Sequence, residues 1–209
     1  MANFTVIYDA CVFYPAPLRD FLMHLALTAL FRARWTETIH KEWIASVLAN
    51  RPDITRAQLE RTRDFMNKAI PDCLVTGYRE LIPGLTLPDP NDRHVLAAAI
   101  RAGAGAIITF NLKDFPPEAL QMYGIEAQHP DEFVTDLLDL DHRKVCAAAR
   151  NQRRNLKSPA QTIAQYLKNL TTKSIARNLV LGRNQSITTG RQNINFNVTA
   201  QVAEQSQII

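Results

Sequence analysis

Acidic and amide side chains occur at four places where a strand or a helix is expected to begin or end. They are Asp9, Glu42, Asp92 with its neighbour Asp89, and the pair Asn111 and Asp114. Clustered carboxylates repel one another, and a divalent cation removes that cost. Mg²⁺ or Mn²⁺ held by a few carboxylates can activate water and stabilise charge on a phosphoryl group. If these side chains converge, they predict metal-dependent hydrolysis of a phosphodiester.

The segments around these residues are typical of alternating strands and helices. Phe4–Asp9 is a short apolar run that ends in a carboxylate, and Ala106–Phe110 is a continuous apolar run of the kind found in a buried parallel strand. This alternation predicts the α/β class: a three-layer α/β/α sandwich with a central parallel sheet. Ligands bind outside the carboxyl ends of parallel strands, so Asp9 and Asn111 are expected at the same edge.

Helical spacing of apolar residues predicts the elements that carry the other acids. Thr36 is a plausible N-cap for the helix that bears Glu42, a second helix is expected over residues 54–70, and residues 74–76 are a candidate short strand. An Ala-rich helix is expected to start near Asp92 and to stop at a glycine. The helix dipole favours an acid at such a start, so a structural role for Asp92 stays open.

The C-terminal part of the chain is expected to be helical and then irregular. Helices are predicted over residues 131–140, 142–156 and 158–170, and the last 26 residues contain nine Asn or Gln without a clear period. The predicted organisation is an α/β domain over residues 1–140, a basic helical extension over residues 141–182, and a polar, disordered tail over residues 183–209.

Charge is unevenly distributed along the chain. Residues 1–141 contain 13 Lys or Arg against 19 Asp or Glu, a net charge of −6, whereas residues 142–209 contain 11 against one, a net charge of +10. A basic segment of this kind can follow a phosphate backbone, and it can equally be a solvated helix face. The basic residues of the predicted extension include Arg143, Lys144, Arg150, Arg153, Arg154 and Lys157.

Several other classes of protein are not indicated. No apolar run is long enough to cross a membrane and no secretory signal is recognisable, so a cytoplasmic location and no membrane partner are expected. Cys11, Cys73 and Cys146 lack disulfide or zinc-site spacing and are expected to be reduced core thiols. No glycine-rich nucleotide-binding motif is present.

Four segments together resemble the PIN-domain nucleases, and in particular VapC-like toxins. Val6-Ile-Tyr-Asp-Ala-Cys-Val12 is similar to the opening strand of that family, and Trp35-Thr-Glu-Thr-Ile-His-Lys-Glu-Trp43 to the segment that bears its glutamate. Residues 88–99 resemble the segment of the third acid, and Ile108-Thr-Phe-Asn-Leu-Lys-Asp-Phe-Pro116 the fourth motif. The likeness covers roughly residues 4–140, and His129 to Phe133 also match a subgroup with a helical C-terminal extension.

The resemblance implies a function and a set of roles. It implies an endoribonuclease that uses Mg²⁺ or Mn²⁺, an RNA substrate, a cognate antitoxin of a type II toxin–antitoxin pair, and a homodimer. The metal ligands would be Asp9, Glu42 and Asp92. Asn111 and Asp114 would position water or substrate, and the hydroxyl of Thr109 is a candidate contact, although β-branched residues are common in strands.

One departure from the family keeps other functions open. Many VapC-like toxins have an aspartate where this chain has Asn111, and an amide is a weaker metal ligand than a carboxylate. A second hypothesis is therefore a regulator that keeps the fold and binds RNA or a protein without cutting. A third is a housekeeping PIN nuclease that has no antitoxin.

Overall fold

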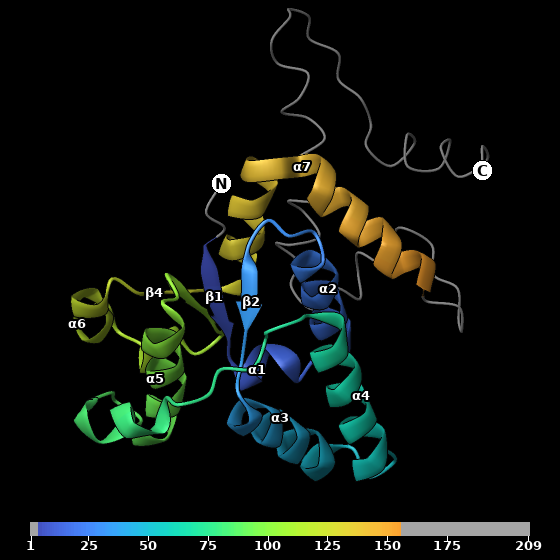
Figure 1. The fold of residues 1–209 in the computed structure, drawn as a ribbon. Helices are drawn as coiled ribbons and strands as arrows, with labels where there is room; N and C mark the ends of the chain where they lie inside the picture. Colours follow the sequence, from blue (N-terminus) through green and yellow to red (C-terminus); the bar gives the residue numbers. More distant parts are fainter. Residues whose placement is uncertain (1–3, 156–209) are drawn as a thin grey trace, which may run out of the picture.

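Four short parallel strands lie at the centre of the fold, and helices cover them. The computed structural model describes residues 4–155. The strands are β1 (Thr5–Tyr8), β2 (Arg32–Arg34), β3 (Ala106–Ile108) and β4 (Glu126–Gln128), in the sheet order β2-β1-β3-β4. Figure 1 shows α2 and α4 to the right of β1 and β2, α3 below them, and α5 and α6 to the left. The predicted α/β fold with a central parallel sheet is confirmed.

The helices alternate with the strands along most of the chain. The α-helices are α1 (Ala10–Phe13), α2 (Ala16–Ala26), α3 (Glu37–Asn50), α4 (Arg56–Ala69), α5 (Arg93–Ala102), α6 (Pro117–Leu120) and α7 (Pro130–Asn155). Short 3-10 turns are η1 (Arg79–Gly84), η2 (Pro90–Asp92), η3 (Leu112–Asp114) and η4 (Gln121–Tyr123). In the described range no helix is long and apolar enough to cross a membrane.

The central strands are buried on both faces, as their composition predicts. Every residue of β1 and β3 is buried, and Ile7 and Ile107 pair directly in the ladder. Aromatic rings pack around β1: Tyr8 stacks on Trp35 with ring centroids 6.3 Å apart and meets Phe13 edge-on at 5.6 Å. Burial of these large apolar surfaces is the main favourable contribution to the stability of the sheet.

The edge strands were not predicted from the sequence, and one predicted strand does not form. β2 and β4 are each three residues long. Their sequences, Arg-Ala-Arg and Glu-Ala-Gln, contain no apolar run. Short, charged strands are common at sheet edges, where pairing with a buried neighbour replaces intrinsic propensity. The prediction of a strand over residues 74–76 is wrong, because this segment forms only an isolated bridge between Trp35 and Leu74.

Helix ends follow the signals in the sequence. The Thr36 side chain accepts a hydrogen bond from the Ile39 backbone and so caps α3, and Thr55 forms a capping box with Gln58 at the start of α4. The helix predicted over residues 54–70 is therefore confirmed, with a start two residues later. Gly103 ends α5 in the left-handed conformation at φ 59°, the predicted glycine stop.

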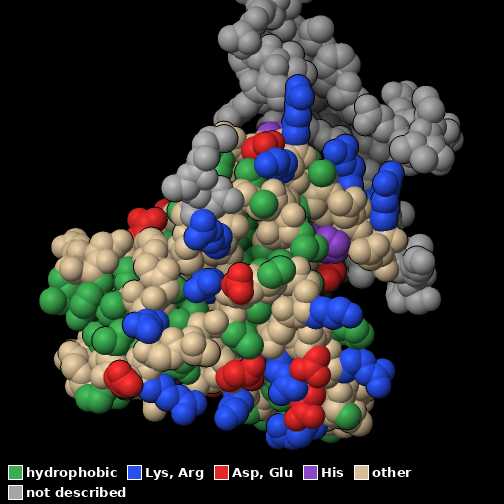
Figure 2. All heavy atoms as spheres, viewed as in Figure 1, with side chains coloured by type: hydrophobic (Ala, Val, Ile, Leu, Met, Phe, Trp, Pro, Cys, Tyr) green, Lys and Arg blue, Asp and Glu red, His purple; other side chains and the backbone are tan. Residues whose placement is uncertain are grey.

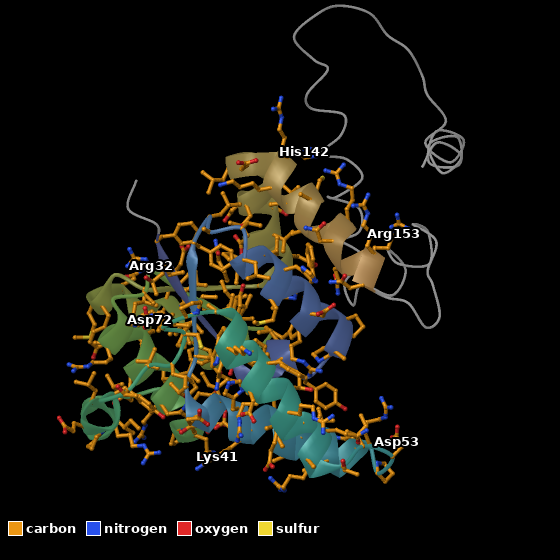
Figure 3. All side chains as sticks on the ribbon, turned by 45° about the vertical axis from the view of Figure 1, so that its right-hand side comes forward. Arg32, Lys41, Asp53, Asp72, His142 and Arg153 are labelled. Carbon is orange, nitrogen blue, oxygen red and sulfur yellow. The ribbon has the colours of Figure 1, made fainter. Side chains whose placement is uncertain are left out.

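Helix α7 contains the break that the sequence predicts between residues 140 and 142. Asp141 has non-helical angles (φ −155°, ψ 85°), and its carboxylate accepts a hydrogen bond from the Lys144 backbone as a new N-cap. Figure 3 shows His142 at this bend and Arg153 farther along the helix. The second half packs on α2, where Gln152 donates to the Pro17 carbonyl at 2.8 Å. The predictions for residues 158–170 and for the tail lie outside the described residues.

Candidate active site

A pocket of about 330 Å³ opens at the carboxyl edge of the sheet. Its wall is formed where β1 runs into α1, by one face of α3, by the start of α5, and by the loop after β3. The residues that line it are Asp9, Ala10, Cys11, Tyr14, Glu42, Ser46, Asp92 and Asn111. Four of the five site residues expected from the sequence, on segments up to about a hundred residues apart, thus border one cavity.

Asp9 is the most firmly held of these acids. It follows β1 directly, is only 5% exposed, and caps α1 through a hydrogen bond from the Ala10 backbone to Oδ1 at 2.6 Å. Its other oxygen, Oδ2, accepts a hydrogen bond from Thr109 Oγ1 at 2.7 Å. Thr109 follows β3, which pairs with β1, so the parallel ladder itself brings the hydroxyl to the carboxylate. The candidate contact of Thr109 with the site is therefore present in the structure.

Cys11 completes the surroundings of Asp9. Its thiol lies 3.1 Å from Asp9 Oδ2 and accepts a hydrogen bond from the Phe110 backbone at 3.2 Å. Burial, and then the neighbouring Asp9 charge, raise the pKa of the Cys11 thiol to about 12. The sulfur therefore stays protonated near neutral pH and acts as a donor to Asp9 rather than as a nucleophile. All three cysteines are free thiols, and Cys73 is buried, whereas Cys11 and Cys146 are half-buried.

Glu42 enters the pocket from the interior of α3, so its expected place at a helix end is wrong, and a histidine contacts it. Its side chain is 40% exposed, and its Oε1 lies 2.7 Å from Nε2 of His94, whose side chain is only 10% exposed. His94 belongs to α5, so this contact joins the helix that carries Glu42 to the helix that begins beside Asp92. No motif or spacing in the sequence singles out His94.

Asp92 experiences the negative charge of the other acids. Partial burial, followed by repulsion from Asp9, Asp89 and Asp114, raises the pKa of the Asp92 carboxyl to about 6. Asp92 makes no capping hydrogen bond at the start of α5, whereas Asp89 accepts one from the Asn91 backbone at 2.8 Å. Asp89 therefore caps the η2 turn, and the Asp92 carboxylate makes no cap and is left to face the pocket.

The fourth motif contributes one pocket residue and one more distant acid. Asn111 lines the cavity, and its backbone N–H donates to Thr109 Oγ1 at 3.0 Å. Asp114 ends the η3 turn and does not line the cavity, although its charge is close enough to raise the pKa of Asp92. The amide thus lies nearer to the pocket than the carboxylate three residues later.

Two further lining residues were not expected from the sequence. Ser46 lies one helical turn after Glu42 on α3, a spacing that places both on one face, so helical periodicity could have pointed to it. Tyr14 ends α1 with its side chain 38% exposed, although the neighbouring Phe13 is fully buried. No sequence signal separates an aromatic residue at a pocket rim from one in the core.

The donors have the chemistry of a divalent-cation site but do not converge tightly. Three carboxylates and an amide are the oxygen ligands that Mg²⁺ and Mn²⁺ prefer. Among the described residues, however, no three His, Cys, Asp or Glu side chains are close enough to hold a metal ion together. Both Asp9 oxygens have donors within the protein, and repulsion between uncompensated carboxylates opposes their convergence. The residues fit the cation in type and charge.

Comparisons with known proteins match both parts of the chain. The family described as PIN domain matches residues 5–113, and the VapC50 C-terminal domain family matches residues 130–176. A protein of Mycobacterium tuberculosis (strain H37Rv), "Putative ribonuclease VapC50", is 53% identical over 64 residues, which are 31% of this chain and 37% of that protein. The match thus spans just over a third of the relative's length. No solved structure matches the chain.

Proposed function

This chain belongs to the PIN-domain family, and from that membership we propose that it is a metal-dependent endoribonuclease and the toxin of a toxin–antitoxin pair. The observation that carries the proposal is the pocket at the carboxyl edge of the sheet, which Asp9, Glu42 and Asp92 border together. The name of the M. tuberculosis relative, "Putative ribonuclease VapC50", supports RNA as the substrate.

In this proposal each acid has a separate task. Asp9, Glu42 and Asp92 hold Mg²⁺ or Mn²⁺, which when bound supplies charge stabilisation and a more acidic water. Asp9 is fixed before binding, because Thr109 and the Ala10 backbone already orient its carboxylate. The Asn111 amide orients water or the phosphate by hydrogen bonding, and Asp114 acts through its charge.

The pocket rim offers a contact for a nucleobase. None of the eight lining residues is Lys or Arg, so phosphate binding in the pocket depends on the cation rather than on side-chain charge. Tyr14 presents an aromatic ring that is 38% exposed beside the carboxylates. Stacking of a base on such a ring contributes about 1–3 kcal/mol and tolerates any base, which suits a substrate whose bases are unpaired.

The partners of the proposed toxin follow from the family resemblance. They are an RNA substrate, a cognate antitoxin that restrains the activity, and a second copy of the chain in a homodimer. The match of residues 130–176 to a domain named after a VapC protein supports placing the chain among these toxins.

The proposal is tested by incubating total RNA with the purified full chain and Mg²⁺ or Mn²⁺, with and without EDTA, beside Asp9→Asn. Cleavage is expected only with metal and with Asp9 intact, because the variant keeps the size of the side chain and loses its charge. The matched control is Asp20→Asn, an exposed acid of α2 outside the pocket, which should cleave like the wild type. Cleavage in EDTA, or by Asp9→Asn, would contradict metal-dependent hydrolysis at this pocket.

A non-catalytic regulator is the second candidate function. It is favoured by Asn111 in the place of a carboxylate and by the lack of three converging ligands among the described residues. This candidate predicts that the folded wild type binds RNA, measured by filter binding, and leaves it intact with every metal supplied. A housekeeping nuclease shares the chemistry of the toxin and differs in having no inhibitory partner.

A further inference from the structure

His94 does not line the acidic pocket, but it contacts one of the acids that do. The residue is 8% exposed, and its Nε2 is 2.7 Å from Oε1 of Glu42. His94 is the second residue of α5, which follows directly on Asp92, whereas Glu42 comes from α3. The contact therefore links two elements that each supply a pocket carboxylate.

The chemistry of the contact fixes which nitrogen carries the proton. A carboxylate only accepts hydrogen bonds, so the hydrogen between the two side chains belongs to Nε2 of His94. The other ring nitrogen, Nδ1, is buried and has no hydrogen-bond partner within the described residues. A buried polar atom without a partner costs stability, so an apolar ring would fill the same space at a lower cost. Within the described residues, the hydrogen bond to Glu42 is the one polar contact that the His94 ring makes.

Glu42 needs such a contact because its own position leaves it free to turn. Its side chain is 40% exposed, and a glutamate has several rotatable bonds whose freedom is lost on binding. A donor on Oε1 restricts those rotations beforehand and leaves Oε2 for a ligand. Hydrogen bonds from residues behind a ligating carboxylate orient it, and their removal typically weakens metal binding or activity about 10- to 100-fold.

We propose that His94 is a positioning residue that holds the Glu42 carboxylate in its binding orientation through Nε2–H. The proposal rests on the proposed function of the pocket as a cation-dependent nuclease site. It adds a residue that makes no contact with the cation or the RNA and acts through Glu42.

The test compares two replacements of His94 in the full chain. His94→Leu removes the donor and keeps an apolar filling, whereas His94→Gln keeps an N–H donor at about the reach of Nε2. Mn²⁺ affinity is measured by calorimetry, cleavage of total RNA by gel, and folding by the thermal unfolding midpoint. We expect a Kd for Mn²⁺ about 10- to 100-fold higher in the Leu variant and most of the affinity restored in the Gln variant. His24→Leu, a histidine on α2 outside the pocket, is the matched control.

A double-mutant cycle separates positioning from packing. In a Glu42→Gln background, His94→Leu should change Mn²⁺ affinity little, because the carboxylate that His94 positions is already gone. If the Leu variant does not fold, His94→Asn replaces it, since its shorter amide does not reach Glu42.

The outcomes distinguish this proposal from the proposed function. A wild type that binds Mn²⁺ and cleaves RNA, with Leu and Gln variants equally impaired or equally normal, would overturn the positioning role and leave the nuclease in place. A wild type that binds no Mn²⁺ and cuts no RNA would overturn the proposed function, and the role of His94 with it.

Discussion

At the scale of single residues, the candidate site is rigid at one acid and adaptable at the others. Asp9 accepts hydrogen bonds on both oxygens, from the Ala10 backbone and from Thr109, whereas Glu42 is 40% exposed and is held on one oxygen. In the proposed cation site, Asp9 would offer the cation a fixed ligand, and Glu42 and Asp92 would adjust to the bound cation.

Asp92 is the residue whose ionisation should be visible in the stability of the protein. Its pKa is raised to about 6, chiefly by burial and then by the charges of Asp9 and other acids. The fold therefore favours the protonated form. Ionisation of Asp92 lowers the free energy of unfolding. This loss is absent below the pKa that Asp92 has in the unfolded chain, grows as the pH rises towards 6, and is complete above 6.

We expect Asp92→Asn to raise the thermal unfolding midpoint in EDTA at pH 8 by about 2–4 °C, the shift that about 1 kcal/mol produces in a chain of this size. The gain should shrink towards zero near pH 4, because both side chains are then neutral. Calorimetry across pH 4–8 measures it. Asp139→Asn, an exposed acid of α7, is the control and should show no such dependence. A gain that is constant with pH would refute the electrostatic explanation.

At the scale of elements, α5 connects the segment of Asp92 to β3 and contacts Glu42 of α3 through His94. It begins directly after Asp92, carries His94 in its first turn, and ends at Gly103, from which the chain turns into β3 and on to Thr109. The turn is short, because Gly105 already donates a backbone hydrogen bond to the carbonyl of Thr5, the first residue of β1. The conformation of Gly103 therefore fixes how α5 and β3 meet.

Gly103→Ala should lower the free energy of unfolding by about 1–2 kcal/mol, the usual cost of a left-handed conformation for a residue with a Cβ. The new Cβ meets nothing within 4 Å, so the cost comes from the backbone alone at φ 59°. Urea unfolding followed by circular dichroism measures the difference. Gly105→Ala is the matched control, because its Cβ also enters open space and its φ is not left-handed. Equal effects of the two changes would show that backbone conformation is not the cause.

At the scale of the whole molecule, the acidic pocket and the basic segment lie on different elements. The pocket is built from α1, α3, the start of α5 and the loop after β3, and α7 contributes no residue to its lining. Figure 2 shows Lys and Arg side chains gathered over α7, and Arg143, Lys144 and Arg150 there are exposed. In the proposed nuclease, such a surface would hold an RNA backbone away from the acidic pocket, since this contact requires charge alone.

Replacing Arg143, Lys144 and Arg150 together by Gln should weaken RNA binding and flatten its salt dependence. Each lost phosphate contact reduces the slope of log K against log salt by about 0.7 for single strands. Fluorescence anisotropy with a labelled RNA at several salt concentrations measures it. The control makes the same charge change with Arg56, Arg61 and Lys68 of α4, all exposed. Equal salt-dependence slopes for both triple variants would show that the basic face of α7 is exposed to solvent and does not bind RNA.

Much of the fold could be predicted because local signals were strong. The apolar runs of β1 and β3, the threonine caps of α3 and α4, and the glycine after α5 each select one local conformation. The edge strands β2 and β4 could not be predicted, because their pairing energy comes from neighbours distant in sequence. The proposed units over residues 1–140, 141–182 and 183–209 stay a prediction, since residues 156–209 lie outside the described part.

By itself, the sequence determined the alternation of elements, the placement of Asp9, Asp92 and Asn111 at element ends and the placement of Glu42 on a helix, because caps, periodicity and apolar runs act over a few residues. Only the tertiary structure decided that these four border one pocket, that Asp114 stays outside its lining, and that Thr109 and His94 hold two of the acids. The physical reason is that hydrogen bonds and charge repulsion depend on distances of a few ångströms in space. Parallel strand pairing and the packing of α5 against the sheet set those distances, and neither can be read from spacing along the chain.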